Sequence, residues 1–237
     1  MLDMLVIRAG MLGIAAAGAV RFKDIHHNLL VDQSAPGREG PWTRSARLDF
    51  LRSPKYLPGP CLGIPSQTFR AWYETTHGAD GWGRLYKIPN QDWRYYLSLL
   101  QRMLALPIRH RTAITRLITH ADYITAVLDD STALPARRVV PATGRGGAGV
   151  WRCRCLAVPD RAVRTNASMI CRFARQACRD IGGGNFAWDH VATALEAGVA
   201  RVDLYARRKV LPQVNRGRGS AHPGFMEGWT AFDAADR

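Results

Sequence analysis

Acidic residues are scarce in this chain of 237 residues. Its 33 lysines and arginines outnumber the 19 aspartates and glutamates, which gives a formal net charge of +14. A balance this basic favours phosphate-bearing partners, which include nucleic acids, anionic membranes and nucleotides. The basic residues are mostly arginine and are spread along the chain without a lysine-rich tail. The charge alone therefore does not choose among these three classes of partner.

Cysteine is also sparse, and its pattern excludes two common uses. Five cysteines at irregular spacings do not form the framework of a small secreted disulfide protein. The seven histidines form no metal or catalytic-triad spacing, so we predict no metal site and assign no catalytic side chain. Four cysteines also lack the spacing of a usual zinc site: Cys153, Cys155, Cys171 and Cys178.

Long apolar runs are absent. No run reaches the roughly 18 apolar residues that a membrane-spanning helix requires. The apolar stretch 11–20 is similar to the centre of a signal peptide, but Asp3 precedes Arg8, so the region before it is not cleanly basic. We therefore expect no membrane span and no export, and the cysteine pattern, which is not that of a secreted disulfide protein, predicts a reducing cytoplasm.

The first part of the chain shows the order strand, tight turn, helix and strand. Residues 4–7 predict a short buried strand, and an alanine-rich helix continues to about Lys23. Residues 27–31 predict a second strand, which ends at Asp32. This order is that of a parallel βαβ unit.

The middle of the chain changes pattern twice. Residues 34–65 are rich in proline, glycine and arginine and predict a long loop. Apolar and aromatic residues at helical spacing then predict helices over 67–76 and 91–105. From 113 to 140 the pattern indicates strands, with a hairpin turn at 129–131.

A second, incomplete βαβ unit is predicted near the end. A helix over 185–197 is expected to end at Gly198, and a strand follows over 201–205. Residues 150–180 are rich in arginine and cysteine and have neither helical nor strand periodicity. Only Ile181 remains of the expected first strand, so this unit is predicted to lack it.

The glycine cluster that opens the second unit fits the dinucleotide-binding pattern G-x-G-x-x-G/A. Gly182 permits the tight turn, Gly184 permits close approach of a pyrophosphate, and Ala187 lets the helix lie close to the strand. The amino end of the helix offers free N–H groups to phosphates. Arg207 and Arg208 follow the next strand, where guanidinium groups favour a 2′-phosphate and hence NADPH.

The glycine cluster of the first unit has the right context but an altered turn. Gly10 and Gly13 occupy the second and third glycine positions of the pattern, and Asp32 lies where an acid binds a ribose hydroxyl. Arg8 occupies the first glycine position. Its side chain is expected to obstruct a turn that often needs the conformational freedom of glycine, although its charge suits a pyrophosphate.

A third match to the glycine pattern lacks its context. Gly144, Gly146 and Gly149 follow a strand, but the residues after them do not open a helix. The helix dipole that binds phosphate is therefore missing, and we interpret this stretch as the exit from a strand into a linker.

Taken together, these features resemble the flavin-containing monooxygenase-like FAD/NAD(P)-binding oxidoreductases of the class B flavoprotein monooxygenase type, which include N-hydroxylating enzymes. The resemblance implies that Gly10, Gly13 and Asp32 hold the phosphates and ribose of FAD. The matching stretches are 4–13, 37–42, 51–55, 62–72, 142–144 and 182–208.

The same resemblance assigns further residues to the cofactors. Gly40, Trp42, Arg52 and Ser53 are expected on the flavin side, and Thr143–Gly144 at the passage between the two nucleotide-binding domains. In such proteins NADPH reduces the flavin, the reduced flavin activates O₂, and oxygen passes to a small-molecule substrate. The protein itself supplies orientation and shielding.

The sequence therefore predicts an α/β fold: a Rossmann-like FAD-binding βαβ domain with a partial second Rossmann-like NAD(P)-binding unit. The expected divisions are an FAD-binding domain over 1–149, an irregular linker over 150–180 and a partial NAD(P)-binding domain over 181–237. By comparison with the family the chain is expected to be truncated, and the loss of pattern over 150–180 suggests an out-of-register translation.

Three functions remain open at this point. The first is an FAD- and NADPH-dependent oxidoreductase of the monooxygenase type, and the second is a catalytically inert nucleotide-binding relic. The third is a basic nucleic-acid-binding protein, which would explain the charge. No predicted helix presents a clustered basic face, however, and the aromatic residues fall at core spacing, so the first function is favoured.

Overall fold

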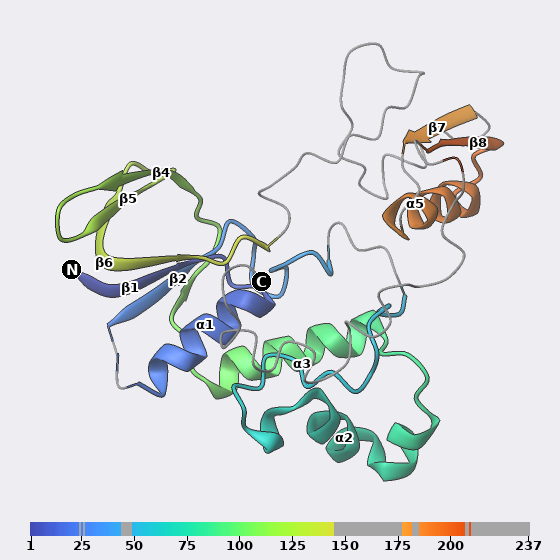
Figure 1. Cartoon of the computed structure of the whole chain (residues 1–237), viewed down its shortest axis with the longest axis horizontal. Helices are drawn as coiled ribbons and strands as arrows, with labels where there is room; N and C mark the ends of the chain where they lie inside the picture. The colour runs from blue at the N-terminus through green and yellow to red at the C-terminus, as the bar shows by residue number, and fades with distance from the viewer. Residues whose placement is uncertain are drawn as a thin grey trace.

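The computed structural model describes residues 1–23, 25, 27–43, 49–144, 177–181, 185–206 and 209 (Figure 1). The strands are β1 (Leu2–Ile7), β2 (Asn28–Val31), β3 (Ile108–Arg109), β4 (Ile114–Thr119), β5 (Ile124–Leu128), β6 (Ala133–Pro141), β7 (Ala177–Ile181) and β8 (Arg201–Tyr205). The helices are α1 (Met11–Arg21), the short 3₁₀ helix η1 (Pro65–Gln67), α2 (Phe69–Arg84), α3 (Asn90–Met103) and α5 (Asn185–Glu196).

The first βαβ unit forms the centre of a mixed sheet with the strand order β3-β2-β1-β6-β5-β4. β1 pairs in parallel with β2 on one side and with β6 on the other. β6, β5 and β4 form an antiparallel meander, which includes the predicted hairpin turn after Leu128. The predicted α/β class with a Rossmann-like parallel sheet is confirmed.

The two faces of β1 are buried by different partners, because successive strand residues point to opposite faces. Val6 and Leu30 face α1, where Ala17 lies fully buried against them. Leu5 and Val31 pack on the other face of the sheet. Their neighbours there come from the meander: Ala126, Leu128 and Ala136.

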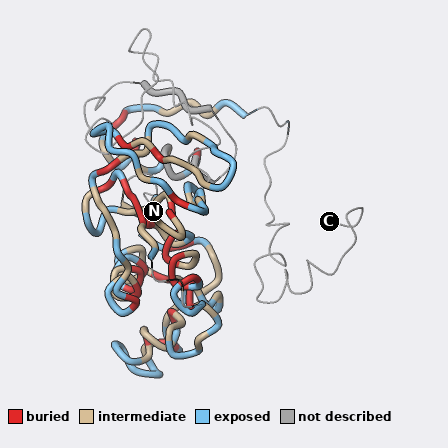
Figure 2. Tube along the Cα trace, turned by 90° about the vertical axis from the view of Figure 1, so that its left-hand side faces the viewer, coloured by how far each residue is buried: buried red, intermediate tan, exposed pale blue. Residues whose placement is uncertain are grey.

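The helical part of the molecule packs around one aromatic residue, Phe69, which is fully buried at the start of α2. The rings of four neighbours lie 5.4–5.7 Å from its centre: Trp72, Tyr73, Trp93 and Tyr96. The hydroxyl of Tyr96 donates a 2.7 Å hydrogen bond to the carbonyl of Gln67, and burial raises the pKa of this hydroxyl. Figure 2 marks these buried segments in red.

The predicted core stripe of α3 is confirmed. Trp93, Tyr96, Leu97, Leu100 and Leu104 are all buried. Placing them every three or four residues brings them to one face of the helix.

One helix and one strand differ clearly from the prediction. The helix expected over 67–76 begins at Phe69, after η1, and continues to Arg84 across a kink at Gly78, whose φ is +76°. The two-residue strand β3 was not predicted, because so short an element has no periodicity to detect.

The second βαβ unit is more complete than predicted. β7 spans Ala177–Ile181 and pairs in parallel with β8, so the expectation that the leading strand is missing was wrong. Four of its residues fall in the stretch assigned to the linker. The strand has two small residues, two charged residues and one isoleucine, so it gives no apolar pattern. The predicted end of α5 is confirmed: Gly198 has a φ of +85°, and its N–H bonds to the carbonyl of Leu195.

Among the described residues, no helix is long and apolar enough to cross a membrane. The described residues also contain no cluster of side chains suited to a metal ion. The cysteine group weighed as a zinc site lies outside the residues whose side chains are described.

Candidate dinucleotide-binding site

The candidate site is the edge of the sheet at which the parallel strands β1, β2, β3 and β6 all end. β2 lies on one side of β1 and β6 on the other, so the chain leaves β1 at a topological switch point. Open α/β sheets bind their ligands at the carboxyl ends of strands at such a point. The segments that meet here are Arg8–Gly10 after β1, Asp32 after β2 and the residues that follow β6.

The turn after β1 depends on glycine at one position and lacks it at another. A β-carbon on Gly13 would lie 2.0 Å from the carbonyl oxygen of Arg8, which is backbone and cannot move aside. Arg8 itself has a φ of +85°, in the left-handed region that disfavours residues with a β-carbon. The predicted conflict at the first glycine position is therefore present as backbone strain.

Asp32 is buried beneath this turn and is 1% exposed. One carboxylate oxygen accepts a 2.8 Å hydrogen bond from the N–H of Ala9, and the other accepts one of 2.7 Å from the N–H of Ser34. The guanidinium of Arg8 lies 3.9 Å from the carboxylate, at the outer limit of an ion pair. Asp32 thus ties the turn after β1 to the end of β2.

The amino end of α1 is suited to an anion. Gly10 precedes the helix and provides no side-chain cap, and the first turn of α1 contains no acidic residue. The first N–H groups of a helix have no partner within it and attract negative charge. A dinucleotide pyrophosphate would therefore fit the residues present here.

Gly40 lies against Gly10. A β-carbon built on Gly10 would be 3.3 Å from the α-carbon of Gly40, so the two backbones approach closely. Gly40 also has a φ of +71°, which only glycine adopts readily. Trp42 follows, and the carbonyl of Trp42 accepts a hydrogen bond of 3.2 Å from the amide of Asn90.

The remaining residues predicted on the flavin side lie on a segment joined to the start of α3. The N–H of Leu51 donates to the carbonyl of Ile88 at 2.7 Å. Arg52 is exposed, and its carbonyl accepts from the ammonium of Lys87 at 3.2 Å. Ser53 is half-buried. Ile88 bonds to the segment of Leu51, and Asn90 bonds to Trp42, so the residues just before and at the start of α3 hold both parts of the predicted flavin side.

Thr143 and Gly144 lie at the candidate edge, as the prediction requires. The N–H of Ala142 donates to the carbonyl of Ile7, the last residue of β1, at 3.0 Å. Thr143 and Gly144 are exposed, and Gly144 has a φ of +63°. They therefore leave the sheet beside the turn that begins at Arg8.

The residues predicted for the second unit are described only in part. Ala187 is buried near the start of α5, as a residue that brings a helix close to its strands should be. Gly182, Gly184, Arg207 and Arg208 lie outside the described residues. Their assignment to NADPH stays a prediction.

Three polar side chains at this edge were not predicted from the sequence. The amide of Gln101 on α3 donates a 3.0 Å hydrogen bond to the carbonyl of Ala9. The carboxylate of Glu39 accepts from the N–H of Gly37 at 3.1 Å and lies 3.3 Å from Nδ1 of His110, just after β3. A polar residue directly after a strand is a usable signal for His110, but only once β3 is known.

Replacing Arg8 by glycine is expected to relieve the strain of the turn. Relative to Arg8→Ala, which keeps the β-carbon, Arg8→Gly should be more stable by about 1 kcal/mol. Urea unfolding followed by circular dichroism measures the difference. Equal stability of the two variants would show that the left-handed conformation at residue 8 costs nothing, contrary to this account.

Comparison with known proteins shows which proteins the chain is similar to. No family model matches the chain. The chain is 36% identical over 242 aligned positions to the FAD-dependent urate hydroxylase of Xanthomonas campestris pv. campestris. The alignment covers 99% of this chain and 51% of the relative, so the chain spans about half the length of the curated relative it matches.

Solved structures share the fold across nearly the whole chain. A mutant of the flavin monooxygenase from Stenotrophomonas maltophilia has a TM-score of 0.62 at 19% identity, covering 97% of this chain and 68% of that one. The ornithine N-hydroxylase of Kutzneria sp. 744, with reduced FAD and NADP⁺, has a TM-score of 0.68 at 13% identity, covering 100% and 61%. The predicted resemblance to flavoprotein monooxygenases is confirmed. Its residue assignments remain predictions, because the structures establish the fold alone.

Proposed function

We propose that this chain binds FAD at the carboxyl edge of β1 and β2 and takes part in flavin-dependent oxygen transfer with NADPH as the reductant. The observation that carries the proposal is the turn after β1, where Gly13 has no room for a β-carbon and α1 presents an uncapped amino end. Such a turn is built for a close approach of phosphate to backbone. The alignment with an FAD-dependent urate hydroxylase, which is 36% identical and covers 99% of this chain, supports the same cofactor.

The residues would divide the work as follows. Gly10, Gly13 and the amino end of α1 would hold the pyrophosphate of FAD, while Asp32 would fix the turn and lie nearest the ribose. Gly40 and Trp42, with the segment of Arg52 and Ser53, would lie toward the flavin. When bound, the flavin would supply the redox and oxygen chemistry, and the chain would supply binding, orientation and exclusion of water.

NADPH is proposed for the second unit. In this unit β7, α5 and β8 form a parallel βαβ arrangement, which is the context the glycine cluster at 182–187 requires. Arg207 and Arg208 follow β8 and would pair with a 2′-phosphate.

Urate is the first substrate to assay, since the relative is named for its hydroxylation. The cytoplasmic location predicted from the cysteines stays a prediction.

The strain at Arg8 favours a second candidate, a nucleotide-binding relic that holds FAD without turnover. Anaerobic mixing of the FAD-loaded full chain with NADPH separates the two. The oxidoreductase should lose the visible absorption of oxidised flavin, and faster with NADPH than with NADH. Retention of the oxidised spectrum with both nucleotides would contradict the proposed activity, and the nucleotide-binding relic would then be the favoured function. A preference for NADH would contradict the role given to Arg207 and Arg208.

A further inference from the structure

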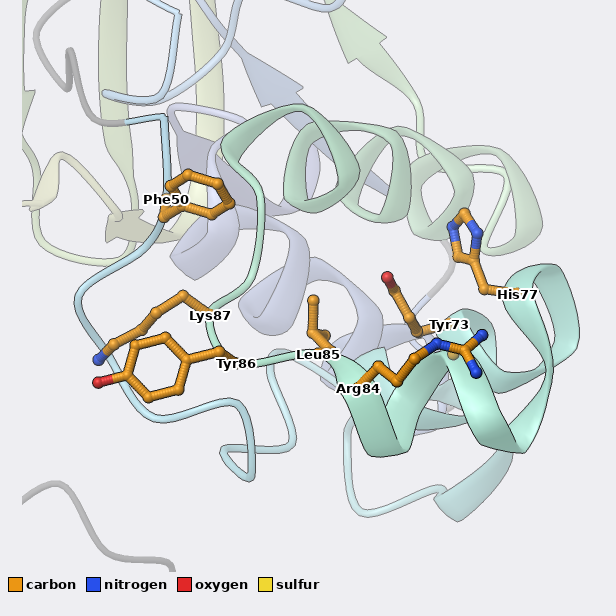
Figure 3. A pocket seen from close by; sticks show the side chains of 8 residues that line it. Phe50, Tyr73, His77, Arg84, Leu85, Tyr86 and Lys87 are labelled. Carbon is orange, nitrogen blue, oxygen red and sulfur yellow. The ribbon is translucent and has the colours of Figure 1, made fainter.

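The molecule has an open groove of about 620 Å³ beside the carboxyl end of α2 (Figure 3). Its walls come from α2, from the connector between α2 and α3, and from Phe50. None of the residues that line it belongs to β1, α1 or β2. Its volume falls within the range of about 300–1,000 Å³ usual for small-molecule sites. The groove is therefore large enough for a ligand of its own.

Aromatic rings form two sides of this groove. On one side Phe50 is 55% exposed and Tyr86 is 86% exposed, although large aromatic side chains are more stable when covered. On the other side the rings of Tyr73 and His77 lie 4.3 Å apart at 36°. Figure 3 shows these two groups on either side of Leu85. Aromatic surface therefore lies at both ends of the groove, on either side of Leu85.

The charge of the groove is positive. Arg84 has no carboxylate partner among the described residues, and its side chain extends beside Tyr73 (Figure 3). The ammonium of Lys87 lies 5.6 Å from the centre of the Tyr86 ring. Burial raises the pKa of the Tyr73 hydroxyl, and Asp92 raises it further while Arg84 opposes it. Asp92 is therefore an acidic group that acts on Tyr73, although it does not line the groove.

We propose that this groove, which we call the aromatic groove, binds a planar aromatic anion such as an aromatic carboxylate. The guanidinium of Arg84 is planar and presents paired donors that match a carboxylate. The exposed rings of Phe50 and Tyr86 cover the aromatic part of the ligand, and Lys87 adds a second positive charge. This binding goes beyond the proposed flavin chemistry and does not depend on it.

The test uses two probes of the same shape and different charge. Isothermal titration of the full chain compares 1-naphthoate, an anion, with 1-naphthamide, which is neutral. The aromatic groove should bind the naphthoate about tenfold more tightly, because a pair of charge-assisted hydrogen bonds is lost with the amide. Cyclohexanecarboxylate, an anion without an aromatic ring, should bind more weakly than naphthoate.

Variants locate the binding. Arg84→Gln removes the charge and should abolish the preference for naphthoate over naphthamide. Tyr86→Ala should weaken both probes, and since this side chain is 86% exposed its loss should not unfold the protein. Arg102→Gln, an exposed residue of α3 outside the groove, removes the same charge and should change neither probe.

Three results would overturn the proposal. They are equal affinity for naphthoate and naphthamide, a preference that survives Arg84→Gln, and an equal loss of naphthoate binding in Arg102→Gln, which would indicate attraction to the overall positive charge. Running the titration with and without added FAD keeps this result apart from the flavin proposal. Naphthoate binding without FAD supports the aromatic groove even if FAD never binds.

Discussion

Gly13→Ala is expected to destabilise the protein by about 3 kcal/mol and to abolish FAD binding. The added β-carbon would lie 2.0 Å from the carbonyl oxygen of Arg8 and 2.9 Å from its carbonyl carbon. Both atoms belong to a backbone turn that is already strained at Arg8, so they cannot yield without displacing α1 from β1. Urea unfolding measures the stability, and titration with FAD measures the binding.

Gly83→Ala is the matched control. Gly83 lies in α2, and a β-carbon there meets no atom within 4 Å. Alanine is favoured over glycine in a helix, so this variant should gain up to about 1 kcal/mol and bind FAD normally. If Gly13→Ala unfolds at the same urea concentration as the wild type and retains FAD, the close contact at the turn is not what the site requires.

Asp32→Ala is expected to have a comparable effect, for a different reason. The change leaves the buried N–H groups of Ala9 and Ser34 without partners. An unsatisfied buried donor costs about 1–3 kcal/mol, so the two together should cost roughly 2–6 kcal/mol. FAD binding should be lost with the turn. Asp32→Asn keeps one accepting oxygen and should be destabilised less, which urea unfolding can resolve.

Asp3→Ala provides the comparison. Asp3 lies at the opposite end of β1, is 43% exposed and is 3.6 Å from Arg137. An exposed ion pair contributes about 0–1 kcal/mol, so its loss should barely change stability or FAD binding. Equal effects of Asp3→Ala and Asp32→Ala would contradict the role of Asp32 as the buried link between β1 and β2.

The elements around the site were predictable where their pattern is local. The first strand, helix and second strand were expected at 4–7, up to about 23, and at 27–31. They are found at Leu2–Ile7, Met11–Arg21 and Asn28–Val31. Burial on both faces makes the last residues of β1 and β2 apolar, Met4–Ile7 and Leu29–Val31, and glycine marks the turn between strand and helix. The hairpin and the core stripe of α3 were predictable for similar reasons.

Elements defined by pairing were not predictable. β7 carries Arg179 and Asp180 and has no apolar period, so it is identified only by its ladder with β8. β3 has two residues, and its parallel bonds to β2 are long-range. The pairing of these strands leaves no pattern in the sequence, because its hydrogen bonds are made by backbone groups that almost every residue possesses.

The residues of the candidate site also fall into a predictable group and an unpredictable group. Gly10, Gly13 and Asp32 could be found because the turn imposes a fixed spacing on them. Gln101 and Glu39 could not, since Gln101 reaches Ala9 from α3, 92 residues along the chain. The burial of Asp32 was also not predictable. The sequence places an acid at the end of β2, but it does not show the two hydrogen bonds that this acid accepts from backbone N–H groups.

The visible spectrum of the full chain, after addition of FAD and removal of the excess, tests the central claim most directly. We expect retained flavin absorption in proportion to protein for the wild type and for Gly83→Ala, and none for Gly13→Ala. A wild-type protein that stays colourless would contradict FAD binding at the carboxyl edge of β1. Salt-sensitive binding of DNA by that colourless protein would then favour the nucleic-acid function instead.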